Sequence, residues 1–203
     1  MKKTSVILIV LFLLSLSACD NGNSNSKLNT ISPADLNERE SSIISTTSHD
    51  AFVFDYKIEG YKEVGVWVEK YESGKLVDDE LIKMTTEINE SNGTIILATS
   101  KTGGERKDQI YNIGVGDEGG TSSTFILVEE IKDVEDQSII SGQLADEKTL
   151  NDDNEENVLA TIAYSDNGST TFISNDFYED PEANIDELNQ YRAVYLLKAK
   201  FVK

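Results

Sequence analysis

The chain has 203 residues, of which 37 are acidic and 18 are basic, and its formal net charge at pH 7 is -19. This acidity disfavours binding to nucleic acid, whose phosphates require a basic face. It also opposes contact between the folded part and an anionic bilayer surface. The length suits one domain of ordinary size. Cys19 is the only cysteine, so an intramolecular disulfide is excluded.

The first residues have the order of a secretory signal. Lys2 and Lys3 precede an apolar run from Val6 to Leu16 that only Ser15 interrupts, and two small residues stand before Cys19. A basic start, a short apolar segment and a small-residue cleavage site are the parts of a signal peptide. The run is shorter than the about 20 apolar residues that a membrane-spanning helix needs. Residues 1–18 are therefore predicted to be removed from the mature protein.

The four residues Leu16, Ser17, Ala18 and Cys19 resemble the lipobox of bacterial lipoproteins. The resemblance implies that the Cys19 thiol receives a diacylglyceryl group and that Cys19 becomes the first residue of the mature chain. Two acyl chains anchor a protein stably, whereas one chain binds only reversibly. The expected location is the extracytoplasmic face of the cell membrane. The alternative is an ordinary secretory signal followed by a chance cysteine.

Residues 19–50 are rich in Asn, Ser, Thr, Asp and Glu, and no apolar period holds in them for long. Such a segment cannot bury enough apolar surface to offset the entropy lost on ordering. It is therefore predicted to be a flexible tether between the lipid and the domain. Ser32 as N-cap and Pro33 at the first helical position indicate a short helix inside it.

Residues 51–203 are predicted to form a single, mainly β domain. Apolar and polar residues alternate in one short run after another, beginning with Phe52, Phe54 and Tyr56, as half-buried strands require. Many short strands with turns between them favour an antiparallel β-sandwich of immunoglobulin-like character. The alternative fold is a lipocalin-like β-barrel.

Turns and one helix interrupt the strands. Asn92-Gly93 and Asn167-Gly168 are typical of type I′ turns and predict two hairpins, and Ser73-Gly74 predicts a further turn. Residues 181–190 are predicted to form the one short helix of the domain, because Asp180 can act as its cap and Pro181 stands at its first position.

Most catalytic constellations lack the residues they need. His49 is the only histidine and falls in the predicted tether, while Cys19 is expected to be lipidated. This disfavours Ser-His-Asp and Cys-His nucleophile systems as well as a zinc centre. We predict a non-enzyme without a cofactor and assign no catalytic residue. A carboxylate pair of the kind that glycosidases use remains as the enzymatic alternative.

Two features are weak candidates for binding. The acidic loop with Asp152, Asp153 and Glu155 offers oxygen ligands that suit calcium, although acidic runs are more often solvated loops. In the strand around Val64, Val66 and Val68, the opposite parity holds Trp67, Tyr71 and two glutamates. If the valines face the core, Trp67 and Tyr71 lie on the outer surface, where they can form a binding patch; burial of Trp67 is the favoured alternative.

The leading functional hypothesis is a lipid-anchored, extracytoplasmic, non-catalytic binding or accessory domain of unknown ligand. The whole chain resembles the small uncharacterised lipoproteins of Gram-positive bacteria, through its lipobox, its Asn/Ser-rich segment and its β domain. Its expected partners are the membrane, through Cys19, and an unknown protein. One alternative is an acidic inhibitor or immunity-type lipoprotein that captures a basic exported protein. The other is a hydrolase of wall polymers or polysaccharides that uses a carboxylate pair.

Overall fold

The computed structural model describes residues 28–101, 109–129, 138–151, 155–166 and 171–203. Strands dominate these residues, and the helices are short. The strands are β1 (Thr30–Pro33), β2 (Asp50–Lys57), β3 (Glu63–Glu72), β4 (Lys75–Glu87), β5 (Asn92–Lys101), β6 (Gln109–Asp117), β7 (Gly120–Val128), β8 (Ser138–Gln143), β9 (Lys148–Thr149), β10 (Glu156–Ser165) and β11 (Ala193–Val202). The helices are α2 (Glu38–Thr47), α3 (Asn175–Glu179) and the 3₁₀ helix η2 (Ile185–Gln190).

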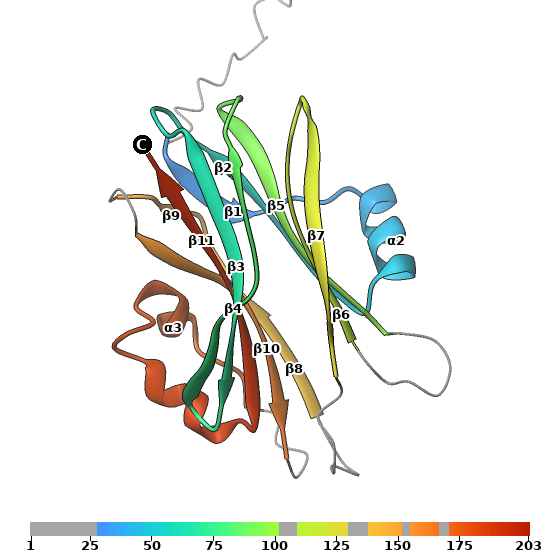
Figure 1. Ribbon diagram of the computed structural model, residues 1–203, viewed down its shortest axis with the longest axis vertical. Coiled ribbons are helices and arrows are strands. Elements are labelled where there is room, and N and C mark those ends of the chain that lie inside the picture. Colours follow the sequence, from blue (N-terminus) through green and yellow to red (C-terminus); the bar gives the residue numbers. More distant parts are fainter. Residues whose placement is uncertain (1–27, 102–108, 130–137, 152–154, 167–170) are drawn as a thin grey trace, which may run out of the picture.

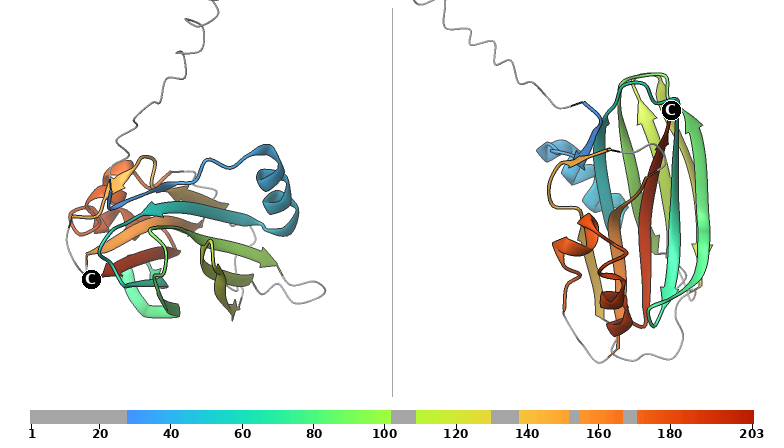
Figure 2. Two further views of the ribbon diagram at one scale, coloured as in Figure 1. Left: turned by 90° about the horizontal axis from the view of Figure 1, so that it is seen from above. Right: turned by 90° about the vertical axis from the view of Figure 1, so that its left-hand side faces the viewer.

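The described strands form two antiparallel sheets that pack face to face (Figures 1 and 2). Sheet A has the strand order β7-β6-β5-β2-β1-β9, and sheet B has the order β4-β3-β11-β10-β8. The predicted mainly β, antiparallel sandwich is confirmed. The described strands stay in two separate sheets and are not closed into the lipocalin-like barrel that was the alternative. The six and five strands make these sheets larger than the four- and three-stranded sheets of a constant-type immunoglobulin domain.

The core lies between the sheets and is filled by alternate residues of each strand. Phe54 from sheet A and Phe201 from sheet B are at most 2% exposed, and the ring centroid of Phe201 lies 5.3 Å from that of Tyr56. Strand β10 departs from alternation, because every residue from Asn157 to Ser165 is buried. A strand that is buried on both faces reads as a continuous apolar run, which indicates that the outer face of sheet B is covered at β10.

That cover is the segment of residues 171–191, where the structure corrects the predicted helix. Residues 181–190 do not form one α-helix from Asp180: α3 ends before them, at Glu179, and only η2 follows, from Ile185. Ser174 caps α3 instead, since its side chain accepts a hydrogen bond from the backbone N–H of Phe177. Phe177 is fully buried, and so is Leu188 of η2. Burial of these side chains against sheet B therefore breaks the segment into two short pieces.

The predicted tether was wrong for the residues from Thr30 onwards. Strand β1 lies between β2 and β9, and its Ile31 is fully buried in the core. The ten-residue helix α2 follows where only a short helix at Ser32 was expected. Its N-cap is Asn37, which forms a capping box with Glu40. A single well-placed apolar residue and a good cap thus order a segment whose overall composition is polar.

Of the predicted turns at Ser73-Gly74 and Asn92-Gly93, the structure has the first but not the second. Ser73 and Gly74 both have positive φ and join the paired strands β3 and β4, as a type I′ hairpin requires. The hairpin predicted at Asn92-Gly93 was wrong: both residues belong to β5 in sheet A, whereas the preceding strand β4 belongs to sheet B. The second predicted Asn-Gly hairpin, at Asn167-Gly168, lies outside the described residues.

Candidate functional site

The parity of β3 decides where its aromatic side chains lie. Val64, Val66 and Val68 are fully buried and face the core, so Trp67 and Tyr71 lie on the outer face of sheet B. Both are nevertheless buried, with exposed fractions of 7% and 8%. The patch on the outer face was the functional prediction and the burial of Trp67 its alternative. In the structure Trp67 and Tyr71 lie on the outer face of sheet B and are buried there.

The covering segment of residues 171–191 packs on the same outer face of sheet B, over β10 and β8. Strand register aligns Glu69, Leu196, Thr161 and Gly142 in one row across β3, β11, β10 and β8. The hydroxyls of Thr161 and Tyr178 lie 2.8 Å apart, which fixes α3 over this row. A Cβ atom at Gly142 would lie 2.5 Å from the Tyr178 hydroxyl, so the glycine makes room for the contact.

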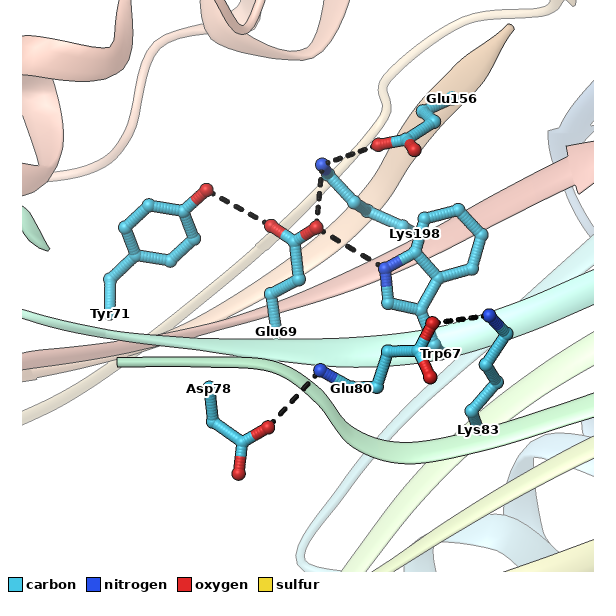
Figure 3. A network of polar contacts seen from close by, with 8 residues as sticks. All are labelled: Trp67, Glu69, Tyr71, Asp78, Glu80, Lys83, Glu156 and Lys198. Atoms are coloured by element: carbon cyan, nitrogen blue, oxygen red, sulfur yellow. Dashed lines mark hydrogen bonds and ion pairs between the residues drawn. The ribbon is translucent and has the colours of Figure 1, made fainter. Parts of the chain in front are cut away.

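Glu69 is the centre of a buried network at the end of this row (Figure 3). Its Oε1 accepts hydrogen bonds from the indole Nε1 of Trp67 at 3.2 Å and from the ammonium of Lys198 at 2.8 Å. Its Oε2 accepts one from the Tyr71 hydroxyl at 3.0 Å. Lys198 also donates to Glu156 at 3.0 Å. The residue is only 5% exposed, so these donors replace the water that its charge has lost.

The environment of the network also shifts pKa values. Burial disfavours the charged ammonium of Lys198, but the hydrogen bonds and charges of Glu69 and Glu156 outweigh burial and raise its pKa. Burial, together with the charge and hydrogen bond of Glu69, raises the pKa of Tyr71 well above its usual value. At neutral pH Lys198 is therefore charged and Tyr71 is a neutral donor.

A groove of about 320 Å³ opens beside the network, and we call it the Trp67 groove. The ammonium groups of Lys83 and Lys198 each lie 5.9 Å from the Trp67 ring centroid, so cations flank the indole. Lys83 is itself paired with Glu80. The groove is lined by Glu63, Gly65, Trp67, Glu69, Asp79, Glu80, Lys83, Thr85, Glu156, Lys200 and Val202.

The groove combines occupied and available polar groups. Glu69 already accepts three hydrogen bonds, whereas the side chains of Asp79 and Lys200 make none, and no ion pair, with any described residue. Among the described residues, the lining therefore offers two free carboxylates, Glu63 and Asp79, and one free ammonium, Lys200. Such a groove suits a polar ligand that carries groups of both signs. Sequence parity had placed Trp67 and Tyr71 on one face with two glutamates. Lys198 lies 129 residues after Glu69 in the chain, so no local sequence pattern indicated that the two side chains are in contact.

The calcium candidates are not brought into this site. Asp152 and Asp153 lie outside the described residues, and Glu155 is half-buried. Among the described residues, no group of three or more His, Cys, Asp or Glu side chains is arranged to hold a metal ion. The neighbour of Glu155, Glu156, joins the Glu69 network instead.

His49 has a defined position next to β2 and does not lie in a flexible tether. Its backbone N–H donates to the carbonyl of Thr99 at 2.6 Å, and its Nδ1 lies 2.7 Å from Asp50 Oδ2. Ser141 donates to the other oxygen of Asp50 at 2.8 Å. In a catalytic triad the imidazole stands between serine and acid, whereas here the carboxylate stands between the other two. The three side chains therefore join β2 of sheet A to β8 of sheet B, without the contact that activates a nucleophile.

Comparison with known families matches almost all of the described domain. A family model described as the YgaN domain covers residues 30–201. The chain belongs to the YgaN domain family. The match begins at β1, so the family boundary agrees with the structure in assigning residues 30–50 to the domain. Searches of curated protein sequences and of solved structures gave no significant match.

Proposed function

We propose that this YgaN domain is a lipid-anchored, extracytoplasmic, non-catalytic binding domain, and that its ligand binds in the Trp67 groove. The observation that carries the proposal is the pair of unpaired, opposite charges, Asp79 and Lys200, beside a buried and fully bonded floor. Ligand sites combine concavity with a few fixed polar groups, and a volume of about 320 Å³ lies within their usual size range.

The Glu69 network supports binding because it organises the floor in advance. Trp67 is held through its indole N–H, and Tyr71 through its hydroxyl, before any ligand arrives. A side chain that is already ordered loses little entropy on binding, so more of the contact energy remains as affinity. The same network favours a non-catalytic role, because the polar atoms of Glu69 and Lys198 are committed to one another.

The proposed location rests on the residues before the domain. The order of Lys2, Lys3, the apolar run and the Leu16–Cys19 motif resembles a lipoprotein signal. The family match begins at residue 30, shortly after Cys19, so a lipid on Cys19 would hold the domain near the membrane. No helix in the described parts of the chain is both long and apolar enough to cross a bilayer.

The single tryptophan provides a test of the binding role. The full chain, labelled with fluorotryptophan and purified in neutral detergent, contains one fluorine atom, at Trp67. Titration with detergent-solubilised membranes and soluble wall fragments of the producing cells is expected to shift or broaden this fluorine NMR signal. The reversed charge in Lys83→Glu, on the groove, is expected to abolish the response, because an anion replaces one of the two cations beside the ring.

The matched control is Glu182→Gln, which changes an exposed acid that is not among the residues lining the groove. It is expected to respond as the unchanged protein does. A Trp67 signal that no envelope fraction alters, or a response that Lys83→Glu retains, contradicts binding in the Trp67 groove.

A further inference from the structure

The lining of the Trp67 groove is interrupted at Gly65, where the sheet has no side chain, and we call this place the Gly65 hollow. Apart from the chain neighbours of Gly65, an added Cβ atom would have only one heavy atom within 4 Å, the Thr85 hydroxyl oxygen at 3.8 Å. Gly65 is not among the glycines with positive φ, so the backbone of β3 does not require a glycine here. What the glycine provides is open space in the groove.

Four side chains of different chemistry surround the Gly65 hollow. Strand register places Thr85 of β4 on one side of Gly65 and Lys200 of β11 on the other. Within β3, Glu63 and Trp67 are the neighbours of Gly65 on the same face, because alternate residues of a strand share a face. All five residues line the Trp67 groove. A hydroxyl, an ammonium, a carboxylate and an indole therefore bound the hollow.

The ammonium of Lys200 is left without a protein partner. Lys200 is opposite Glu156 in the pairing of β10 with β11. The Glu156 carboxylate nevertheless accepts its hydrogen bond from Lys198, at 3.0 Å (Figure 3). Lys200 is half-buried and forms no hydrogen bond or ion pair with any described residue. Its charge therefore remains available at the wall of the hollow.

The carboxylate of Glu63 is also free among the described residues. Its cross-strand neighbours are Glu87 on β4 and Val202 on β11, so no cation stands opposite it. A like charge directly opposite is unfavourable, and a ligand cation beside Glu63 offsets it. Glu63 and Lys200 are diagonal neighbours on paired strands, at positions about 7 Å apart. A single small molecule can therefore reach both charges.

We propose that the Gly65 hollow binds a free α-amino acid in its zwitterionic form. The proposal rests on the proposed binding role of the Trp67 groove and names the ligand of that site. The ligand carboxylate accepts hydrogen bonds from the Lys200 ammonium and from the Thr85 hydroxyl, which makes no hydrogen bond with any described residue. The ligand ammonium donates to Glu63, and the ligand side chain lies toward the Trp67 indole.

The closeness of the two free charges favours a free amino acid over a peptide. An α-amino acid carries its ammonium and its carboxylate on the same carbon atom, so both reach the diagonal pair of Glu63 and Lys200 together. A peptide carries these two charges at opposite ends of its chain, and its internal residues carry neither on the main chain. A peptide therefore pairs with only one of the two protein charges at the hollow.

Titration of the full chain, labelled with fluorotryptophan and held in neutral detergent, tests the proposal. The probes are the twenty standard amino acids, added one at a time while the Trp67 fluorine signal is followed. At least one of them is expected to shift the signal in a saturable way. The N-acetylated and the amidated forms of that amino acid each lack one of the two charges. Both are expected to bind at least about ten-fold more weakly.

Two variants of the hollow are each expected to weaken binding by about ten-fold or more. Gly65→Val fills the hollow, and a β-branched residue suits a strand whose backbone does not need glycine. Lys200→Met removes the ammonium. The matched control Lys75→Met removes an exposed ammonium that does not line the groove, and it is expected to change the affinity by less than about two-fold. Circular dichroism of each variant checks that the sheets are intact.

The outcomes separate the ligand from the binding role. A Trp67 signal that envelope fractions shift and no amino acid shifts overturns the choice of ligand, while the binding role of the Trp67 groove stands. A signal that neither shifts overturns both. The proposal is also overturned if folded Gly65→Val and Lys200→Met bind the amino acid as the unchanged protein does, or if Lys75→Met weakens binding as much as they do.

Discussion

Replacing Glu69 with leucine is expected to lower the free energy of unfolding by about 3 kcal/mol or more, because it leaves buried donors without their acceptor. The Lys198 side chain is only 14% exposed and keeps just one of its two carboxylate partners. The Trp67 indole N–H and the Tyr71 hydroxyl lose their only hydrogen-bond acceptor among the described residues. Denaturant titration followed by circular dichroism measures the loss.

Two further variants separate a buried network from ordinary surface charge. Glu156→Gln is expected to cost less than about 1 kcal/mol, since the Glu156 side chain is 50% exposed. The double variant Glu69→Leu with Lys198→Met is expected to regain part of the stability that Glu69→Leu loses, because no unpaired ammonium then remains buried. If Glu69→Leu costs no more than Glu156→Gln, Glu69 does not organise the floor of the Trp67 groove.

The fold is expected to unfold sharply in alkali, because six tyrosines have raised pKa values. Burial is the largest cause for each of them, and for Tyr178 it raises the pKa to about 12. In the unfolded chain the tyrosines release their protons near pH 10, which is the ordinary pKa of tyrosine. The folded chain retains these protons at that pH. Stability is therefore complete below about pH 10 and falls above it, by about 1.4 kcal/mol per pH unit for each tyrosine. The six are Tyr56, Tyr71, Tyr111, Tyr178, Tyr191 and Tyr195.

A pH titration that follows tyrosinate absorbance and circular dichroism together measures this effect. The absorbance of most tyrosines is expected to rise only as the circular dichroism of the sheets disappears, in one transition. In denaturant, the same chain is expected to titrate gradually around pH 10. Gradual ionisation of most tyrosines while the sheets remain intact would contradict the burial described for them.

Local patterns in the sequence predicted the strands well, and the parity of β3 is the clearest case. The alternation of Val64, Val66 and Val68 placed Trp67 on the outer face, where the structure has it. Trp67 is covered in part by Lys83 from β4 and Lys198 from β11, whose ammonium groups each lie 5.9 Å from its ring centroid. Neither contact has a signature in the residues around Trp67, because each depends on how distant strands pair.

The wrong predictions, of a hairpin at Asn92-Gly93 and of a tether over residues 30–50, have physical reasons of the same kind. Gly93 follows an asparagine, which is typical of a turn, but it lies in a strand because Tyr56 needs the space that a side chain would fill. Residues 30–50 are polar in composition, yet pairing of β1 with its neighbours and the Asn37 cap order them. Composition describes the average of a segment, whereas β1 is placed by its pairing with β2 and β9 and by the burial of Ile31.

We propose a binding domain that a lipid on Cys19 holds outside the cell membrane. Growing the producing cells with a clickable fatty acid tests this lipid anchor, with Cys19→Ala as the matched control. We expect the mature protein to carry the label and to remain with the membrane, where added protease reaches it in cells stripped of their wall. Cys19→Ala is expected to lose the label. An unlabelled mature protein, or a Cys19→Ala variant that stays membrane-bound, would rule out the lipid anchor at Cys19.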